Sequence, residues 1–496
     1  MTEWVFCGRA SYHARKQCAG NSGSRSRKLT HKKVTNKPLA CIQNQSKYVL
    51  TNRLLHLHPK SIKTILHAKG NIMGNVSFLK NVPPIPPAQT QPRILTIDVL
   101  RGFALFGILY AHMIFWYSGG PLPEYVYTAY MDIPNGIATA FNFLFFNAKF
   151  FSLFSFLFGL SFYIQIKGLT AKHENAVVRF AWRLFILGVI GVIHHLFWRA
   201  DILTIYVPLG FLLLFARNLS NKTTAILAAI LILNLPTKVI EAISIIVQGK
   251  PEFIADNFVE NGAKYYAAIT QGTFADVVAH NIYAIQEKID YQLSSGRFLI
   301  TFGFFLLGML AGRLKWFEDI EASQPFFKKV WKKSGLTIIA VALASIAFGI
   351  AVNVLAVDVK NAPWVRWIGG SLVDVFNASV TIFYIACISL LMLKPKWHAR
   401  LAPLSHIGKM ALTSYLTQSL FGVILFFHFG LGLFFITSPS MNALLCFIVF
   451  GVQIAFCKLW LQHFNYGPVE WLWRSATYLK WQPLQKKQNQ ELPQQA

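Results

Sequence analysis

The chain has 496 residues, of which 54% are hydrophobic and only 14% are charged. This balance excludes an ordinary soluble domain and indicates a multi-pass membrane protein. The net charge of +27 is uneven, because residues 1–72 hold 14 lysines and arginines against the single acid Glu3. The remaining excess lies mostly in loops on one predicted side, which is typical of helical membrane proteins, so we predict no nucleic-acid partner.

Residues 1–72 have no sustained helical or strand period, no apolar core of a signal peptide and no small-residue cleavage site. Their basic, acid-poor composition predicts a disordered extension, although it also resembles a transit peptide. A gene start placed too far upstream, with Met73 as the real start, is the alternative. Residues 73–92 include "VPPIPPAQTQP", which predicts an extended lead-in to the first helix.

About ten apolar segments are long enough to be transmembrane helices, so the predicted fold class is an all-α, polytopic helical membrane protein within residues 93–483. Basic residues gather before the first segment and after the even-numbered ones, which predicts that both termini and the polar tail 484–496 are cytoplasmic. The predicted spans are 94–117, 137–166, 177–198, 201–217, 222–247, 297–315, 334–356, 364–393, 404–430 and 440–463.

One connection on the predicted outer side is long. Residues 248–296 mix acids and bases, and their apolar positions recur at helical spacing, which predicts amphipathic helices at the outer surface. Such a segment either covers a site from outside or is a plain interfacial connector, and the sequence favours neither.

The first span carries Asp98, Arg101 and His112. Ionisable groups inside a bilayer cost about 2.5 to 3.5 kcal/mol each on insertion scales, so each is a candidate functional residue. Asp98 and Arg101 lie on one helix face and can pair, although an arginine near the boundary can also extend to the interface. His112 lies about 16 Å further along the helix axis, in the predicted outer half. It is either a catalytic residue or a neutral histidine that is hydrogen-bonded to a backbone carbonyl.

The third span ends "GVIGVIHHLFWRADILTIY", which brings His194, His195, Arg199 and Asp201 to the same predicted depth as His112. An imidazole beside a carboxylate is the usual arrangement of a general base. A metal site with two histidines and a carboxylate is the competing chemistry, but the spacing matches no metal motif and no cysteine pair has CxxC spacing. We predict no metal.

Two further basic residues and one hydroxyl-rich segment are the other polar groups of the predicted spans that we consider as candidates for a site. Lys149 lies inside the second span, where it must reach the bundle interior, a carboxylate such as Asp98, or a phosphate. Arg183 begins the third span. The ninth span contains "GKMALTSYLTQS", whose hydroxyl and amide groups more often join helices than form a site.

Six blocks of this sequence resemble those of the YeiB-like bacterial inner-membrane proteins, a family with a domain-of-unknown-function label. They are "TIDVLRGFALFGIL", "KFFSLFSFLFGLSF", "HHLFWRADILTIYVPLG", "FGFFLLGMLAGRLKWF" and the C-terminal "GKMALTSYLTQS" with "GPVEWLWR". That family is similar to a wider set of transmembrane acyltransferases, including the lysosomal heparan glucosaminide acetyltransferase and enzymes that acylate O-antigen. Many of their members carry an arginine, ten residues and a histidine in the first helix, the spacing of Arg101 and His112.

The resemblance implies a multi-pass protein of the bacterial inner membrane that transfers an acyl group across it. The implied donor substrate is acyl-CoA, bound near Arg101 and Asp98 with Lys149 or Arg183 on its phosphates, and no other cofactor is indicated. His112 or His195 would take a proton from a glycan or lipid acceptor, with Asp201 orienting the base. A small-molecule transporter or channel is one alternative, because Pro236 in "LILNLPTKVIEA" is predicted to break the fifth span, as transporters often require. A non-catalytic envelope protein is the other. The substrate and the oligomeric state stay open.

Overall fold

The computed structural model describes residues 94–120, 122–171, 175–249, 258–359 and 361–486. The expectations for residues 1–72 and 73–92, and for most of the tail 484–496, lie outside these ranges. Over the described ranges the chain forms helices and no β-strand, apart from an isolated antiparallel bridge between Phe464 and Gln485. The prediction of an all-α fold is confirmed.

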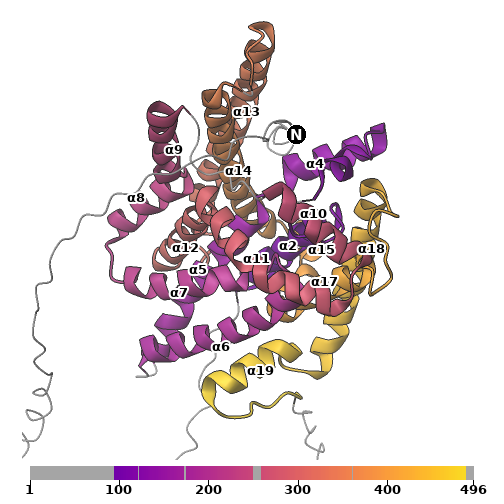
Figure 1. Cartoon of the computed structure of the whole chain (residues 1–496). Coiled ribbons are helices and arrows are strands. Elements are labelled where there is room, and N and C mark those ends of the chain that lie inside the picture. The colour runs from indigo at the N-terminus through magenta and orange to yellow at the C-terminus, as the bar shows by residue number, and fades with distance from the viewer. Residues whose placement is uncertain (1–93, 121, 172–174, 250–257, 360, 487–496) are drawn as a thin grey trace, which may run out of the picture. The chain divides into compact units, whose positions relative to one another are not determined.

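The helices follow one another along the described chain (Figure 1). In chain order they are α2 (Leu95–Met113), α3 (Glu124–Thr128), α4 (Ile133–Phe145), α5 (Phe150–Ala171), α6 (Ala176–Phe197), α7 (Leu203–Ala216), α8 (Asn221–Ile232), α9 (Leu235–Gln248), α10 (Phe258–Gln271), α11 (Phe274–Ser294), α12 (Arg297–Arg313), α13 (Gln324–Val354), α14 (Pro363–Met392), α15 (Pro395–Leu401), α16 (Leu404–Lys409), α17 (Ala411–Phe426), α18 (Pro439–His463) and α19 (Pro468–Tyr478).

Six helical segments of the described chain are long and apolar enough to cross a membrane: α2, α4 with α5, α6, α13, α14 and α18. Two bent pairs, α8 with α9 and α11 with α12, raise the number to eight if each pair is one span. The expected spans 201–217 and 404–430 correspond to the shorter apolar helices α7 and α17, with 14 and 16 residues. The count of ten is therefore not reached by length and composition, because a straight span needs about 20 residues.

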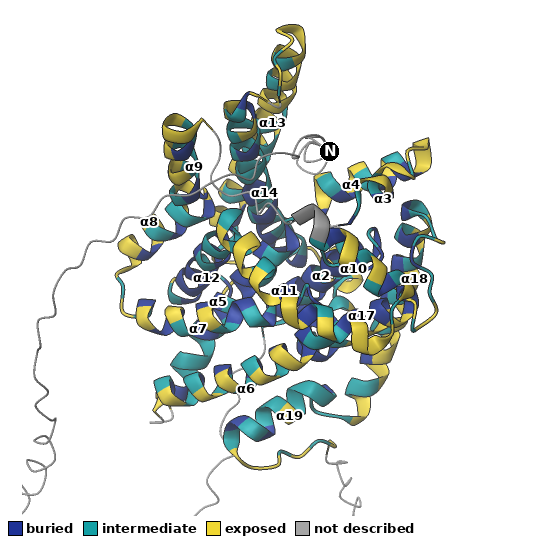
Figure 2. Cartoon of the chain, in the orientation of Figure 1, coloured by how far each residue is buried: buried dark blue, intermediate teal, exposed yellow. Residues whose placement is uncertain are grey.

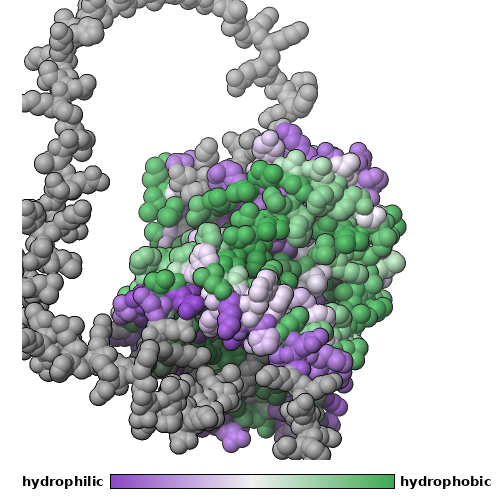
Figure 3. Space-filling model, turned by 90° about the horizontal axis from the view of Figure 1, so that it is seen from below, coloured by the Kyte–Doolittle hydropathy of each residue, from purple (hydrophilic) through white to green (hydrophobic). Residues whose placement is uncertain are grey.

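The surface of this bundle is strongly apolar. The apolar stretch of α13 that is long enough to cross a membrane contains no buried residue. The helix exposes leucines and isoleucines along its length (Figure 2). Figure 3 shows broad hydrophobic areas on the face seen from below, with hydrophilic side chains gathered in patches. Exposing so much apolar surface to water is unfavourable, so these faces fit the hydrocarbon interior of a membrane.

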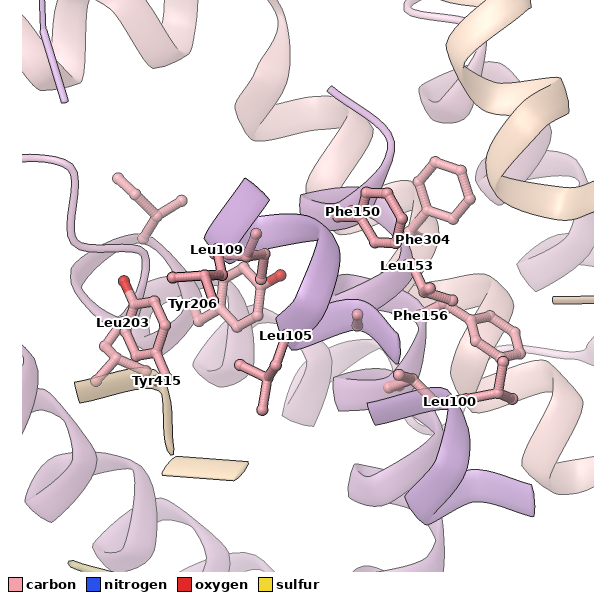
Figure 4. Close-up of a cluster of buried hydrophobic side chains, with 14 of the residues drawn as sticks. Leu100, Leu105, Leu109, Phe150, Leu153, Phe156, Leu203, Tyr206, Phe304 and Tyr415 are labelled. Atoms are coloured by element: carbon pink, nitrogen blue, oxygen red, sulfur yellow. The ribbon is translucent and has the colours of Figure 1, made fainter. Parts of the chain in front are cut away.

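Helix α2 lies at the centre of the core. Figure 4 labels three of its leucines, Leu100, Leu105 and Leu109. They belong to one buried cluster with side chains of α5, α7, α12 and α17, of which the labelled ones are Phe150, Leu153, Phe156, Leu203, Tyr206, Phe304 and Tyr415. Glycines allow the closest contacts, because a Cβ on Gly408 of α16 would collide with the Asp98 carbonyl of α2. Small residues at helix contacts are typical of membrane bundles.

The predicted break at Pro236 is observed. Helices α8 and α9 meet at a 45° bend, where Asn234 adopts the left-handed conformation with φ 54° and Pro236 lies in the first turn of α9. Proline fits the first turn because that turn has no intrahelical partner for its missing N–H. The predicted single span 222–247 is therefore two helices.

Candidate functional site

The candidate site is built on the turn between α6 and α7. Helix α6 ends at Phe197, and Trp198 continues in an extended conformation. Asp201 then accepts a hydrogen bond from the Thr204 N–H at 2.7 Å, which satisfies an unpaired donor in the first turn of α7. The turn thus holds a carboxylate directly beneath the last turn of α6, where His194 and His195 lie.

His194 and Asp201 form a fully buried pair. The His194 Nδ1 atom lies 2.6 Å from Asp201 Oδ1, and both side chains are at most 1% exposed. Burial alone would raise the pKa of the Asp201 carboxyl, but the hydrogen bond from His194 and the nearby Lys288 charge hold that pKa below its usual range. An ionised Asp201 only accepts hydrogen bonds, so Nδ1 of His194 carries a proton and donates it, which leaves Nε2 as the ring nitrogen that faces away from the carboxylate.

His195 has the opposite surroundings. Its Nε2 lies 3.0 Å from the Asn281 carbonyl, so this nitrogen donates, and its Nδ1 lies 3.2 Å from Lys288 Nζ, so that nitrogen accepts. Both ring nitrogens are occupied. The sequence predicted that Asp201 would orient His195, whereas the carboxylate is bonded to His194, because the neighbouring residue of a helix faces about 100° away.

His112 joins the same region through aromatic contacts. Its ring packs edge-on against Trp198, with centroids 4.7 Å apart, and Trp198 in turn packs against His194 at 5.7 Å. Tyr117 lies beside both His112 and Trp198, at 5.4 Å from each. His112 was expected beside His195 and Asp201; its ring instead reaches the end of α6 through Trp198, and the imidazole on the other side of Trp198 is that of His194.

Two buried polar atoms of this aromatic cluster have no hydrogen-bond partner among the described residues: His194 Nε2 and the Tyr117 hydroxyl. Tyr117 also has a left-handed backbone, φ 54°, which is uncommon for a bulky side chain. The indole N–H of Trp198 holds this conformation by donating to the Tyr117 carbonyl at 2.8 Å. Unpaired buried atoms and strained backbone both occur more often at functional sites.

Helix α11 contributes four side chains that sequence reasoning did not identify: His280, Asn281, Glu287 and Lys288. Lys288 donates to Thr204 Oγ1 at 2.7 Å, and Glu287 accepts from Arg199 at 2.7 Å. The signal was present, because Asn281 and Lys288 share the helical face of the buried residues Val277 and Ala284. Of the two expectations for residues 248–296, this geometry fits a cover over the turn.

The residues expected to bind a donor do not gather in one place. Arg101 pairs with Asp98 at 2.7 Å, as predicted, and donates to Ser161 of α5 at 2.6 Å. Lys149 is 1% exposed and donates to the Phe143 carbonyl at 2.5 Å, at the break between α4 and α5. Arg183 lies elsewhere, over the Trp473 ring of α19 at 3.7 Å. Lys149 thus has a local structural partner, a carbonyl at a helix C-terminus.

The C-terminal block "GPVEWLWR" has a structural role in the described chain. Glu470 of α19 accepts hydrogen bonds from the N–H groups of Leu412 and Thr413, at 2.6 and 3.0 Å, and from the Thr413 hydroxyl at 2.5 Å. A carboxylate at a helix N-terminus satisfies unpaired donors and complements the helix dipole. Glu470 therefore attaches α19 to the start of α17, which explains why this block accompanies "GKMALTSYLTQS".

No group of three or more histidine, cysteine, aspartate or glutamate side chains in the described ranges is arranged to hold a metal ion. The carboxylate and imidazole of the α6–α7 turn instead form a hydrogen-bonded pair. The fold and this site define the class: a multi-pass helical membrane protein with a buried polar site at one helix turn.

A family model described as "Protein of unknown function (DUF418)" matches residues 311–480. The uncharacterized protein YxaH of Bacillus subtilis (strain 168) is 30% identical over 433 residues, which cover 81% of this chain and 98% of YxaH. The chain belongs to the DUF418 family of proteins of unknown function, so the resemblance to the YeiB-like proteins is confirmed.

Two other relatives align over similar lengths. The uncharacterized 39.9 kDa protein in the amylase 3' region of Bacillus acidopullulyticus is 26% identical over 401 residues, 79% of this chain and 96% of the relative. The uncharacterized protein YeiB of Escherichia coli (strain K12) is 26% identical over 404 residues, 78% and 96% respectively. No solved structure matches the chain. None of these descriptions states an activity.

Proposed function

We propose that this protein is an acyltransferase of the bacterial inner membrane. In the proposed topology α7 and α17 also cross the bilayer, which makes ten spans with both termini cytoplasmic. The observation that carries the proposal is the free Nε2 of His194, buried and oriented by Asp201. A histidine held by a carboxylate and lacking a partner on its other nitrogen is what general base catalysis needs.

In the proposed reaction, His194 Nε2 takes the proton of an acceptor hydroxyl. The hydroxyl oxygen attacks the carbonyl carbon of an acyl thioester, the carbon–sulfur bond breaks, and the thiolate leaves and is protonated. Asp201 stabilises the imidazolium that forms. Tyr117, with its unpaired hydroxyl, and His112 would line the acceptor side of this centre.

The donor would approach from the opposite end of α2. Arg101, paired with Asp98 and bonded to Ser161, is the charged group of that end, eleven residues from His112. His195 has a positioning role in this proposal, since Lys288 and Asn281 occupy both of its nitrogens.

The test uses full-length protein in proteoliposomes of bacterial membrane lipids, supplied with radiolabelled acetyl-CoA. We expect label to enter a lipid or glycan fraction, and we expect His194→Gln and Asp201→Asn to lower this rate by about 100-fold, because general base catalysis contributes that much. His463→Gln is the matched control: this exposed ring bonds only to its own helix carbonyl.

Full transfer by folded His194→Gln protein would overturn the assignment of the base. The absence of any labelled product from the wild-type protein, together with uptake of a solute that depends on Arg101, would overturn acyl transfer itself.

A transporter is the second candidate, supported by a polar cluster at the α8–α9 bend. Asn234 donates to Asp374 of α14 at 3.0 Å and to the Ser295 carbonyl at 3.2 Å, and Lys238 lies 4.0 Å from Asp374. Broken helices that bring charged groups together at membrane depth are typical of transporters. Uptake abolished by Asp374→Asn, with acetyl-CoA not consumed, would favour this candidate.

A further inference from the structure

Two arginines meet where α19 packs on α6, next to each other in Figure 1. The Arg183 guanidinium stacks on Trp473 at 3.7 Å, and the Trp473 indole donates back to the Arg183 carbonyl at 2.9 Å. Arg474, the next residue of α19, stacks on Tyr466 and Tyr478 at 5.0 and 5.5 Å. Arg183 of α6 and Arg474 of α19 therefore both lie at the contact between these two helices.

Nothing in the described chain neutralises these two charges. Neither Arg183 nor Arg474 forms an ion pair within the described ranges, and the Nε atom of each is buried without a hydrogen-bond partner. The nearest acid in sequence, Glu470, already accepts three hydrogen bonds at the start of α17. A buried donor without a partner is unfavourable, more so when it is charged, so two of them at one helix contact favour a bound anion.

The geometry favours one chemical class of anion. The planar guanidinium binds phosphate oxygens through two parallel N–H groups, and aromatic rings beneath both guanidinia hold the two forks in place. The same helix contact carries exposed apolar side chains: Trp182 of α6, which donates to the Ala476 carbonyl of α19 at 3.2 Å, is 40% exposed, and Leu472 of α19 is 49% exposed. Exposed tryptophan and leucine beside arginine are typical of the membrane interface.

We propose that Arg183 and Arg474 form a binding site for a phosphate group between α6 and α19. The phosphate belongs either to the headgroup of an anionic phospholipid or to a soluble phosphate ester. This site does not depend on acyl transfer, since it lies between α6 and α19 and contains none of the side chains of the α6–α7 turn.

The test measures binding to full-length protein in detergent. In one arm, native mass spectrometry counts retained phosphatidylglycerol against phosphatidylcholine. In the other, thermal stability is followed with added pyrophosphate in delipidated protein. We expect one of the two ligands to bind, and the double variant Arg183→Gln/Arg474→Gln to weaken that binding at least about tenfold, the effect of one lost charge-assisted contact.

Arg400→Gln is the matched control, because Arg400 also stacks on a tryptophan, Trp397, but is an exposed residue on α15. If the double variant does not fold, Arg183→Lys/Arg474→Lys keeps both charges and loses the forks, and we expect it to bind several-fold more weakly than wild type. Phosphatidylglycerol retention lost in the variant assigns a lipid, and loss of the pyrophosphate shift assigns a soluble ligand. Equal binding by wild type, both variants and the control would overturn the site.

Discussion

His194 and His195 are adjacent in sequence and opposite in chemistry. His194 has one nitrogen on Asp201 and one buried nitrogen without a partner, whereas both nitrogens of His195 are bonded to α11. Nothing in "IHHLFWRAD" distinguishes them, because both lie one or two turns from the same carboxylate. The side chains of a different helix decide which histidine keeps a free lone pair.

Glu470 provides a pH test at the same scale. Burial raises the pKa of this carboxyl, even against the donors of Leu412 and Thr413. The folded-state pKa lies above the unfolded value of about 4.3, so the folded protein binds the proton more tightly than the unfolded chain does. The stabilisation that comes from protonating Glu470 is therefore complete below about pH 4.3 and is lost as the pH rises through the folded-state pKa. We expect the thermal stability of the wild-type protein to fall as the pH rises from about 4.3 through the folded-state pKa, and that of Glu470→Gln to fall less.

The measurement is the unfolding temperature of both proteins across the interval from about pH 4 upward, with the mutant as its own reference at each pH. Parallel curves for the two proteins would contradict the raised pKa. A separate variant, Glu470→Ala, removes all three acceptor contacts and should lower the unfolding temperature at every pH.

At the scale of helices, backbone contact between α5 and α12 holds the core together. A Cβ on Gly159 would collide with the Phe305 carbonyl, and one on Gly308 with the Phe156 carbonyl, so each helix presents a glycine to the other. Membrane helices gain little from the hydrophobic effect against each other, so close packing of this kind supplies much of their association.

Gly308→Ala tests this contact directly. The added methyl group must displace a backbone carbonyl, and we expect a loss of about 1 to 3 kcal/mol, seen as a lower unfolding temperature and less monodisperse protein in detergent. Gly349→Ala in α13 is the matched control, because nothing lies within 4 Å of that position. There alanine should be neutral or stabilising by up to about 1 kcal/mol, since glycine is a poor helix former. Equal stability of the two variants would argue against the close contact.

For the whole molecule, the proposed topology assigns each loop to one side. The link after α2 has the acids Glu124 and Asp132 and no base, whereas the link from α12 into α13 is rich in lysine. Ten spans with cytoplasmic termini put the first link outside and the second inside. Six or eight spans, as length and composition alone allow, would change the side of several later loops.

Cysteine labelling in intact cells distinguishes these arrangements. Tyr125→Cys, at a residue that is 53% exposed in the first link, should react with a membrane-impermeant maleimide before lysis. Lys328→Cys, near the start of α13, should react only after the membrane is opened. Labelling of Lys328→Cys in intact cells, above the wild-type background from native cysteines, would disprove the ten-span topology.

The sequence alone determined the class of the protein, the helical fold, the Asp98–Arg101 pair and the break at Pro236, because each depends on composition or on spacing within one helix. It also indicated that His112 and the end of α6 share one region. Only the tertiary structure decided that Asp201 serves His194, that Lys149 binds a carbonyl and that Glu470 caps α17. Those contacts join residues from different turns or helices, and which side chain reaches which partner depends on how helices rotate and cross in the bundle.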